Sequence, residues 1–149
     1  MNIEMDINHK YEETTIVVRA PELNGEITDL IERLKSSKTK NIIGKNNEKM
    51  YILSPKDILL FYSKDQKVIA DTINGEYEIK QKLYELEEEL NGMYFVRISK
   101  FAIVNINKIK DIELFFNGSL VVNLINGKQE VISRRYVSKV KEFIGMGGK

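Results

Sequence analysis

Short apolar runs separated by turn-forming residues dominate the chain from residue 41 onward. Runs rich in Val, Ile, Leu, Phe and Tyr that are bounded by turn residues are typical of antiparallel strands. Asn-Gly pairs at residues 74–75, 117–118 and 126–127 mark turns between such runs. The pattern predicts strands at residues 49–53, 57–62, 67–72, 76–79, 94–98, 109–116, 120–125 and 130–132.

Three other segments carry apolar residues at helical spacing. They predict an amphipathic helix over residues 25–35, a central helix stopped by the Asn91-Gly92 pair, and a last helix over residues 134–144. The apolar stripes are most simply core, although self-association is an alternative for the first. The stripes are Ile27, Leu30, Ile31 and Leu34; Ile79, Leu83, Leu86 and Leu90; and Val137, Val140 and Ile144.

The domain organisation follows from these elements. The β-branched residues 14–19 predict a strand before the first helix, so residues 1–44 form an N-terminal strand-helix unit and residues 45–149 form the main domain. The small unit must pack on the main domain or on a second copy of itself, because two elements cannot bury a core alone. Many short strands with few helices indicate a β-dominated α+β fold.

Composition narrows the function classes. The chain has no cysteine, no apolar run long enough to span a membrane and no signal-peptide pattern at its start, so we expect a cytoplasmic protein without membrane insertion. The single histidine, His9, lies in a polar stretch, and no phosphate-binding glycine loop, nucleophile elbow or metal-spaced cluster is visible. We therefore expect no enzyme activity, no catalytic residue, no cofactor and no metal.

Charge is distributed unevenly along the chain. Residues 1–93 carry 13 Lys and Arg against 18 Asp and Glu, a net charge of −5, whereas residues 94–149 carry 10 against 4, a net charge of +6. A basic second part indicates a surface that faces a polyanion.

Basic residues occur beside apolar runs at two points of that second part. The segment Phe95-Val-Arg-Ile-Ser-Lys-Phe-Ala-Ile-Val-Asn105 is followed by Ser133-Arg-Arg-Tyr136 at the start of the last helix. Ser133 is a natural N-cap, but two cations in a first turn oppose the helix dipole. An anionic ligand at the helix start would account for them.

The pattern F-V-R-I-S-K-x-x-I-V-N followed by V-I-S-R-R-Y resembles the LytTR family of bacterial DNA-binding domains, over roughly residues 45–145. The resemblance implies compact antiparallel sheets with a packed helix, and DNA reading through loops rather than through a helix-turn-helix. It implies that Arg135 reads a base, that Arg134 contacts the backbone and that Asn105 forms a turn. The implied DNA-binding residues are Lys64, Gln66, Lys67, Arg97, Ser99, Lys100, Ser133, Arg134, Arg135 and Tyr136.

The expected function is that of a bacterial transcriptional regulator that binds duplex DNA as a homodimer on two repeated half-sites. Residues 1–40 show no phosphoacceptor pattern, and the resemblance makes a membrane-protein regulator a candidate partner. The alternative is a protein-interaction or ligand-sensing module that kept the fold without DNA binding. Phe101-Ala102, where family members usually have a small hydroxyl residue, and the net charge of +1 support that alternative.

Overall fold

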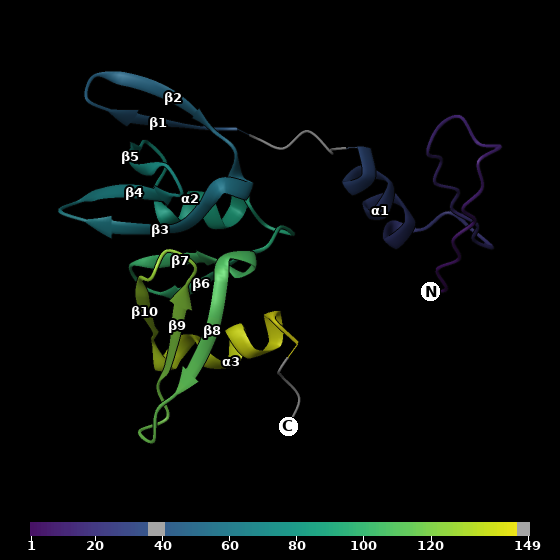
Figure 1. Cartoon of the computed structure of the whole chain (residues 1–149). Helices are drawn as coiled ribbons and strands as arrows, with labels where there is room; N and C mark the ends of the chain where they lie inside the picture. The colour runs from purple at the N-terminus through teal and green to yellow at the C-terminus, as the bar shows by residue number, and fades with distance from the viewer. Residues whose placement is uncertain (36–40, 146–149) are drawn as a thin grey trace. The chain divides into compact units, whose positions relative to one another are not determined.

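Strands are the main secondary structure in the larger part of this computed structural model, which describes residues 1–35 and 41–145 (Figure 1). The chain divides into two units, residues 1–38 and residues 39–149. The larger unit has a seven-stranded sheet of order β2–β1–β5–β4–β3–β7–β6 and a three-stranded sheet of order β10–β9–β8, both antiparallel. The strands are β1 (Ile42–Asn46), β2 (Lys49–Leu53), β3 (Ile58–Lys64), β4 (Lys67–Thr72), β5 (Gly75–Ile79), β6 (Phe95–Ser99), β7 (Ala102–Asn105), β8 (Ile109–Leu114), β9 (Leu120–Leu124) and β10 (Gln129–Ile132).

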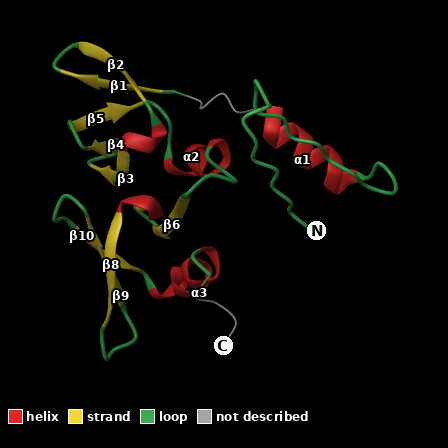
Figure 2. Cartoon of the chain, turned by 45° about the vertical axis from the view of Figure 1, so that its right-hand side comes forward, coloured by secondary structure: helices red, strands yellow, loops and turns green. Residues whose placement is uncertain are grey.

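Strand β3 is buried on both faces and separates two layers of core. Ile58 and Phe61 pack in one layer with the helix α2 (Leu83–Glu89). Leu59 and Leu60 pack in the other layer with β9, β10 and the helix α3 (Arg134–Phe143). Successive strand residues point to opposite faces, and a bulge between Ile58 and Leu60 shifts this alternation. In Figures 1 and 2 the three-stranded sheet and α3 lie below the seven-stranded sheet.

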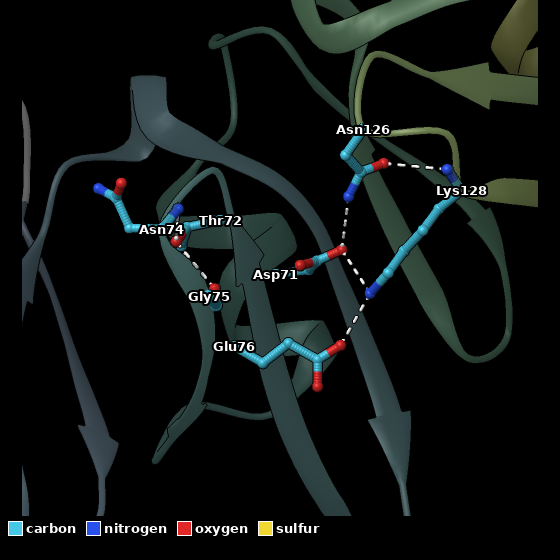
Figure 3. Close-up of polar contacts among 7 residues, drawn as sticks. All are labelled: Asp71, Thr72, Asn74, Gly75, Glu76, Asn126 and Lys128. Carbon is cyan, nitrogen blue, oxygen red and sulfur yellow. Dashed lines mark hydrogen bonds and ion pairs between the residues drawn. The ribbon is translucent and has the colours of Figure 1, made fainter.

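A polar cluster joins the two sheets (Figure 3). Lys128, in the turn between β9 and β10, places its Nζ atom 2.8 Å from the carboxylate of Asp71 on β4 and 2.7 Å from that of Glu76 on β5. The Asn126 amide donates to the same Asp71 oxygen at 3.2 Å. The Asp71 side chain is only 5% exposed, so these partners satisfy a buried carboxylate.

The β-dominated α+β fold predicted from the sequence is confirmed, and each predicted strand from residue 49 onward is present. Two strands were missed. Strand β7 has four buried residues and so lacks the alternation that marks a half-buried strand. Strand β1 contains Gly44, which interrupts the apolar pattern of the strand. A glycine is required at this position, because a Cβ atom there would lie 2.7 Å from the Cβ atom of Tyr77.

The three predicted helices are present, and the first, α1 (Gly25–Lys35), has the predicted bounds. Ile79, which the sequence places on the central helical stripe, instead ends β5, where it pairs with Val68 and Gly44. It still shares a core layer with Leu83, so the stripe joins a strand to a helix. Gly92 stops this segment with φ of +84°, as expected for a left-handed cap.

The prediction of a strand at residues 14–19 is wrong. These residues form no strand, because strand propensity is realised only when a neighbour supplies the hydrogen bonds, and the described part of the N-terminal unit offers none. Taken by itself, this unit has no fully buried side chain among residues 1–34. The apolar stripe of α1 is therefore half-buried at best.

No helix of the described residues is long and apolar enough to cross a membrane.

Candidate nucleic-acid interface

The β3–β4 hairpin presents the first group of predicted contact residues. Its two-residue turn consists of Asp65 and Gln66, with φ of +52° and +66°, a geometry that matches the twist of a tight hairpin. Lys64 and Lys67 face each other across the base of the turn, and Lys64, Gln66 and Lys67 are all exposed. The Nζ atom of Lys67 lies 3.8 Å from the carboxylate of Glu78, on the neighbouring strand β5. The hairpin projects from the sheet at the left of Figure 1.

The β6–β7 turn presents the second group, and Arg97 shapes it. The Arg97 Nε atom donates to the carbonyl of Ser99 at 2.7 Å, and a terminal nitrogen donates to the carbonyl of Lys100 at 2.6 Å. The same guanidinium is paired with Glu87 of α2, and the side chain is only 12% exposed. Lys100 is exposed and Ser99 half-buried. The guanidinium of Arg97 therefore has its partners within the protein and holds the β6–β7 turn, from which Lys100 projects.

The start of α3 presents the third group. Ser133 occupies the N-cap position as predicted, but its hydroxyl makes no capping hydrogen bond. Arg134 and Arg135 are exposed, and Tyr136 is half-buried against the second core layer. Arg135 makes no hydrogen bond or ion pair with the described residues, whereas a terminal nitrogen of Arg134 donates to the carbonyl of Asn117 at 3.3 Å.

Two backbone hydrogen bonds between elements place these three groups next to one another. The amide of Ser63, at the end of β3, donates to the carbonyl of Phe101 in the β6–β7 turn at 2.9 Å. The amide of Ser133, before α3, donates to the carbonyl of Ile98 on β6 at 2.9 Å. The β6–β7 turn therefore lies between the β3–β4 hairpin and the start of α3. We call the surface formed by these three segments the three-loop surface.

A fourth element, the turn between β8 and β9, reaches the same region; the Asn117-Gly118 pair predicts the turn itself, but no sequence pattern predicts its place beside α3. Asn117 lies in this turn and accepts the hydrogen bond from Arg134. The neighbouring Phe116 is fully exposed. Residues in turns of separate hairpins have no periodic relation in sequence, so only the tertiary structure brings Asn117 to the helix start.

Charge on the three-loop surface comes from cations at the ends of elements. Lys64 and Lys67 supply it at the hairpin, Lys100 at the turn, and Arg134 and Arg135 at the helix. Glu87 of α2 pairs with Arg97 and lies 3.7 Å from the Nζ atom of Lys139. Cations that protrude beside exposed amides suit contacts with phosphates and base edges.

Metal chemistry has no support among the described residues, where no three His, Cys, Asp or Glu side chains gather closely enough to hold an ion.

Comparison with known proteins gives the family. The model of the LytTr DNA-binding domain matches residues 48–145. A protein of Staphylococcus aureus (strain MSSA476), described as an uncharacterized HTH-type transcriptional regulator, is 32% identical over 143 residues, which cover 95% of this chain and 97% of that protein. A protein with the same description from strain NCTC 8325 is 31% identical over the same length.

A solved structure has a similar fold. It is the LytTr DNA-binding domain of a methyl-accepting/DNA response regulator from Bacillus cereus, with a TM-score of 0.68 and 23% identity over 70% of this chain and 96% of that one. Within residues 41–145 the two helices α2 and α3 are separated by five strands, so they do not form the helix-turn-helix to which the description of the relatives refers. The chain belongs to the LytTR family of DNA-binding domains, and the matched region contains all three segments of the three-loop surface.

Proposed function

We propose that this protein is a transcriptional regulator that reads a specific duplex DNA sequence through the three-loop surface. The observation that carries the proposal is the pair of backbone hydrogen bonds, Ser63 to Phe101 and Ser133 to Ile98, because they gather the three segments into one surface. Family membership supplies the ligand class.

The contacts divide by chemistry. Arg135 is exposed and has no partner among the described residues, so its guanidinium is available to bind the two acceptors of a guanine. Arg134, held toward the β8–β9 turn, suits a phosphate. Gln66 at the hairpin tip suits an adenine edge, and Lys64, Lys67 and Lys100 suit guanine or phosphate.

Arg97, Ser99, Ser133 and Tyr136 have a different part in the proposal. Arg97 orients the β6–β7 turn through the carbonyls of Ser99 and Lys100, which presents Lys100 to the duplex. Ser133 and Tyr136 stand on either side of the two arginines, where a hydroxyl from each can meet a phosphate.

The N-terminal unit makes the protein a homodimer in this proposal. Ile27, Leu30 and Ile31 are half-buried and Leu34 is 41% exposed, so the apolar face of α1 is not covered within its own unit. A second copy can cover it, and a two-fold dimer would engage two repeated half-sites. In the proposal, a protein partner such as a membrane protein would control this assembly.

Selection from random duplex DNA followed by salt titration tests the proposal. The full chain should enrich one sequence, and log K should fall with log salt at a slope near −0.9Z, with Z about 4–8 per subunit. Binding that is absent at low salt or indifferent to salt contradicts DNA reading and favours the interaction-module alternative.

A pair of charge-matched variants locates the contact. Lys64→Ala with Lys67→Ala removes two cations from the hairpin and should make the slope shallower by about two units. Lys45→Ala with Lys49→Ala removes two cations from β1 and β2, the two strands at the end of the sheet farthest from β6 and outside the three-loop surface, and should leave the slope unchanged.

A further inference from the structure

Phe101 occupies the middle of the three-loop surface with its backbone fixed at both ends. Its carbonyl accepts from the Ser63 amide at 2.9 Å, which ties it to the β3–β4 hairpin. Its own amide donates to the Ser99 hydroxyl at 3.0 Å, within the β6–β7 turn. The position of the Phe101 Cα atom is therefore set by two elements, and the direction of its side chain follows from them.

The ring of Phe101 is nevertheless left in water. The residue is 59% exposed and belongs to neither core layer, whereas the next residue, Ala102, is buried. The Nζ atom of Lys100 lies 5.8 Å from the ring centroid, so the ring stands beside one of the cations assigned to the duplex. An exposed aromatic ring on its own needs no explanation. A ring whose backbone is held in this way, within a surface of cations and amides, will be brought to the same ligand as its neighbours.

The chemistry of duplex DNA offers such a ring a specific partner. Among the edge groups of the four bases in the major groove, the 5-methyl group of thymine is the apolar one, and Phe is among the side chains that contact it. Phosphates and the carbonyl and amino groups of base edges would instead lose hydration against an apolar ring without gaining a hydrogen bond.

We infer that Phe101 is a specificity-determining residue that packs against a thymine methyl group, next to the base pairs read by the polar side chains of the three-loop surface. The inference rests on the proposed function and goes beyond it, because it assigns a non-polar contact and a preferred base to a residue outside the polar contact set. It requires that each half-site contain a thymine at one defined position.

Removing the methyl group from the DNA and the ring from the protein tests this contact. Each thymine of the selected duplex is replaced in turn by deoxyuridine, which keeps base pairing and deletes only the methyl group. Full-length protein should lose about fourfold in affinity at one position per half-site, the factor that corresponds to burial of one methyl-sized group. Phe101→Ser should bind the thymine duplex several-fold more weakly and should be insensitive to deoxyuridine at that same position.

Ile52→Ser is the matched control, because Ile52 is 73% exposed on β2, at the opposite edge of the seven-stranded sheet from β6. It should bind like the unaltered protein and keep the fourfold response. Thermal unfolding of Phe101→Ser should match that of the unaltered chain, since the replaced ring is mostly in solvent.

Each other outcome overturns the inference. If Phe101→Ser weakens binding to the thymine and deoxyuridine duplexes equally, the ring packs on the sugar-phosphate backbone and reads no base. If its DNA affinity is unchanged while transcription in a purified system is impaired, the ring meets a protein. If the unaltered chain binds specific DNA without any response to deoxyuridine, the proposed function survives and the thymine contact does not. Absence of DNA binding removes both.

Discussion

Asn105 is completely buried, yet its side-chain amide has a partner at each end. The Nδ2 atom donates to the carbonyl of Ile58 at 2.8 Å, and the Oδ1 atom accepts from the amide of Asn107 at 2.9 Å. The residue thus closes the turn after β7 and ties it to the start of β3. This confirms the sequence-based interpretation of Asn105 as a turn-forming residue.

Replacing Asn105 should destabilise the fold. Asn105→Ala leaves the carbonyl of Ile58 and the amide of Asn107 without their partner, which we expect to lower the free energy of unfolding by about 2–4 kcal/mol, since each orphaned group costs about 1–3 kcal/mol. Urea unfolding measures the change. Asn107→Ala, which removes an exposed side chain, should stay within about 0.5 kcal/mol. Equal stability of the two variants would contradict a structural role for Asn105.

Arg135 and Arg134 are neighbours with different surroundings, and replacing each of them should affect DNA binding differently. Arg135→Ala should cost about 1–3 kcal/mol of binding free energy and relax preference at one base pair, because a bidentate contact with that base is lost. Arg134→Ala, like Lys67→Ala, should weaken all sequences similarly and make the salt slope shallower by about one unit.

Titration of these variants against the selected site and its single-base variants, at two salt concentrations, separates the roles. Thermal unfolding should change little, because both arginines and Lys67 are exposed. If Arg135→Ala weakens every sequence equally, Arg135 does not read a base.

At the scale of elements, the β9–β10 turn is attached to the seven-stranded sheet by the polar cluster around Lys128 (Figure 3). Burial lowers the pKa of the Lys128 ammonium, but its hydrogen bonds to Asp71 and Glu76 and their charges outweigh burial, and the pKa rises above the usual 10.5. The hydrogen bond from Lys128 holds the pKa of the Glu76 carboxyl below 4.5, against the opposing effect of burial.

These two shifts set the pH range of the stabilisation. A carboxyl group whose pKa is lowered by folding stabilises the fold at pH values above its unfolded-state pKa, and this stabilisation is lost as pH falls through the folded-state pKa. An ammonium group whose pKa is raised by folding stabilises the fold at pH values below its unfolded-state pKa, and this stabilisation is lost as pH rises through the folded-state pKa. The cluster should therefore act fully between about pH 4.5 and pH 10.5 and weaken on either side.

Lys128→Met should lower the free energy of unfolding at neutral pH by about 2–4 kcal/mol, because it leaves the Asp71 carboxylate buried without its cation. The figure is discounted for the 42% exposure of the Lys128 side chain. Lys110→Met, on the exposed side of β8, should have almost no effect. Adding Asp71→Asn to Lys128→Met should recover part of the loss. A loss that is purely additive in the double variant would show that the two side chains do not interact.

At the scale of the whole molecule, the two units have different requirements for stability. The larger unit buries two core layers, whereas no side chain among residues 1–34 is fully buried within the smaller one. A helix in a unit without a core depends on packing against something else for its stability. The proposed dimer provides that packing for α1.

A charge on the α1 stripe should therefore change the oligomeric state. The unaltered chain should sediment as a dimer at tens of micromolar, roughly the range in which weak dimers assemble. Ile31→Asp should shift it to a monomer, bind a double site less tightly and keep its affinity for a single half-site. Glu32→Gln, on the exposed face of the same helix, is the control. A monomeric unaltered chain at this concentration would contradict dimerisation through α1.

The amino-acid sequence alone determined the local elements. The bounds of β2, β4 and α1 were predicted correctly, because the period of apolar residues and the turn-forming residues between them act over a few neighbouring positions. The resemblance in the basic motifs also indicated the family. Neither source predicted β7, since a fully buried short strand lacks alternation, and the strand expected at residues 14–19 has no neighbour to pair with.

Only the tertiary structure decided which of these elements meet. Asn105 and Ile58 are 47 positions apart and Lys128 and Glu76 are 52 positions apart, so no local pattern connects them. Sheet order likewise places β7 between β3 and β6, which brings the β3–β4 hairpin, the β6–β7 turn and the start of α3 to one surface. The same packing pairs Arg97 with Glu87, on a helix that the sequence does not link to it, and directs its other nitrogens to the carbonyls of Ser99 and Lys100.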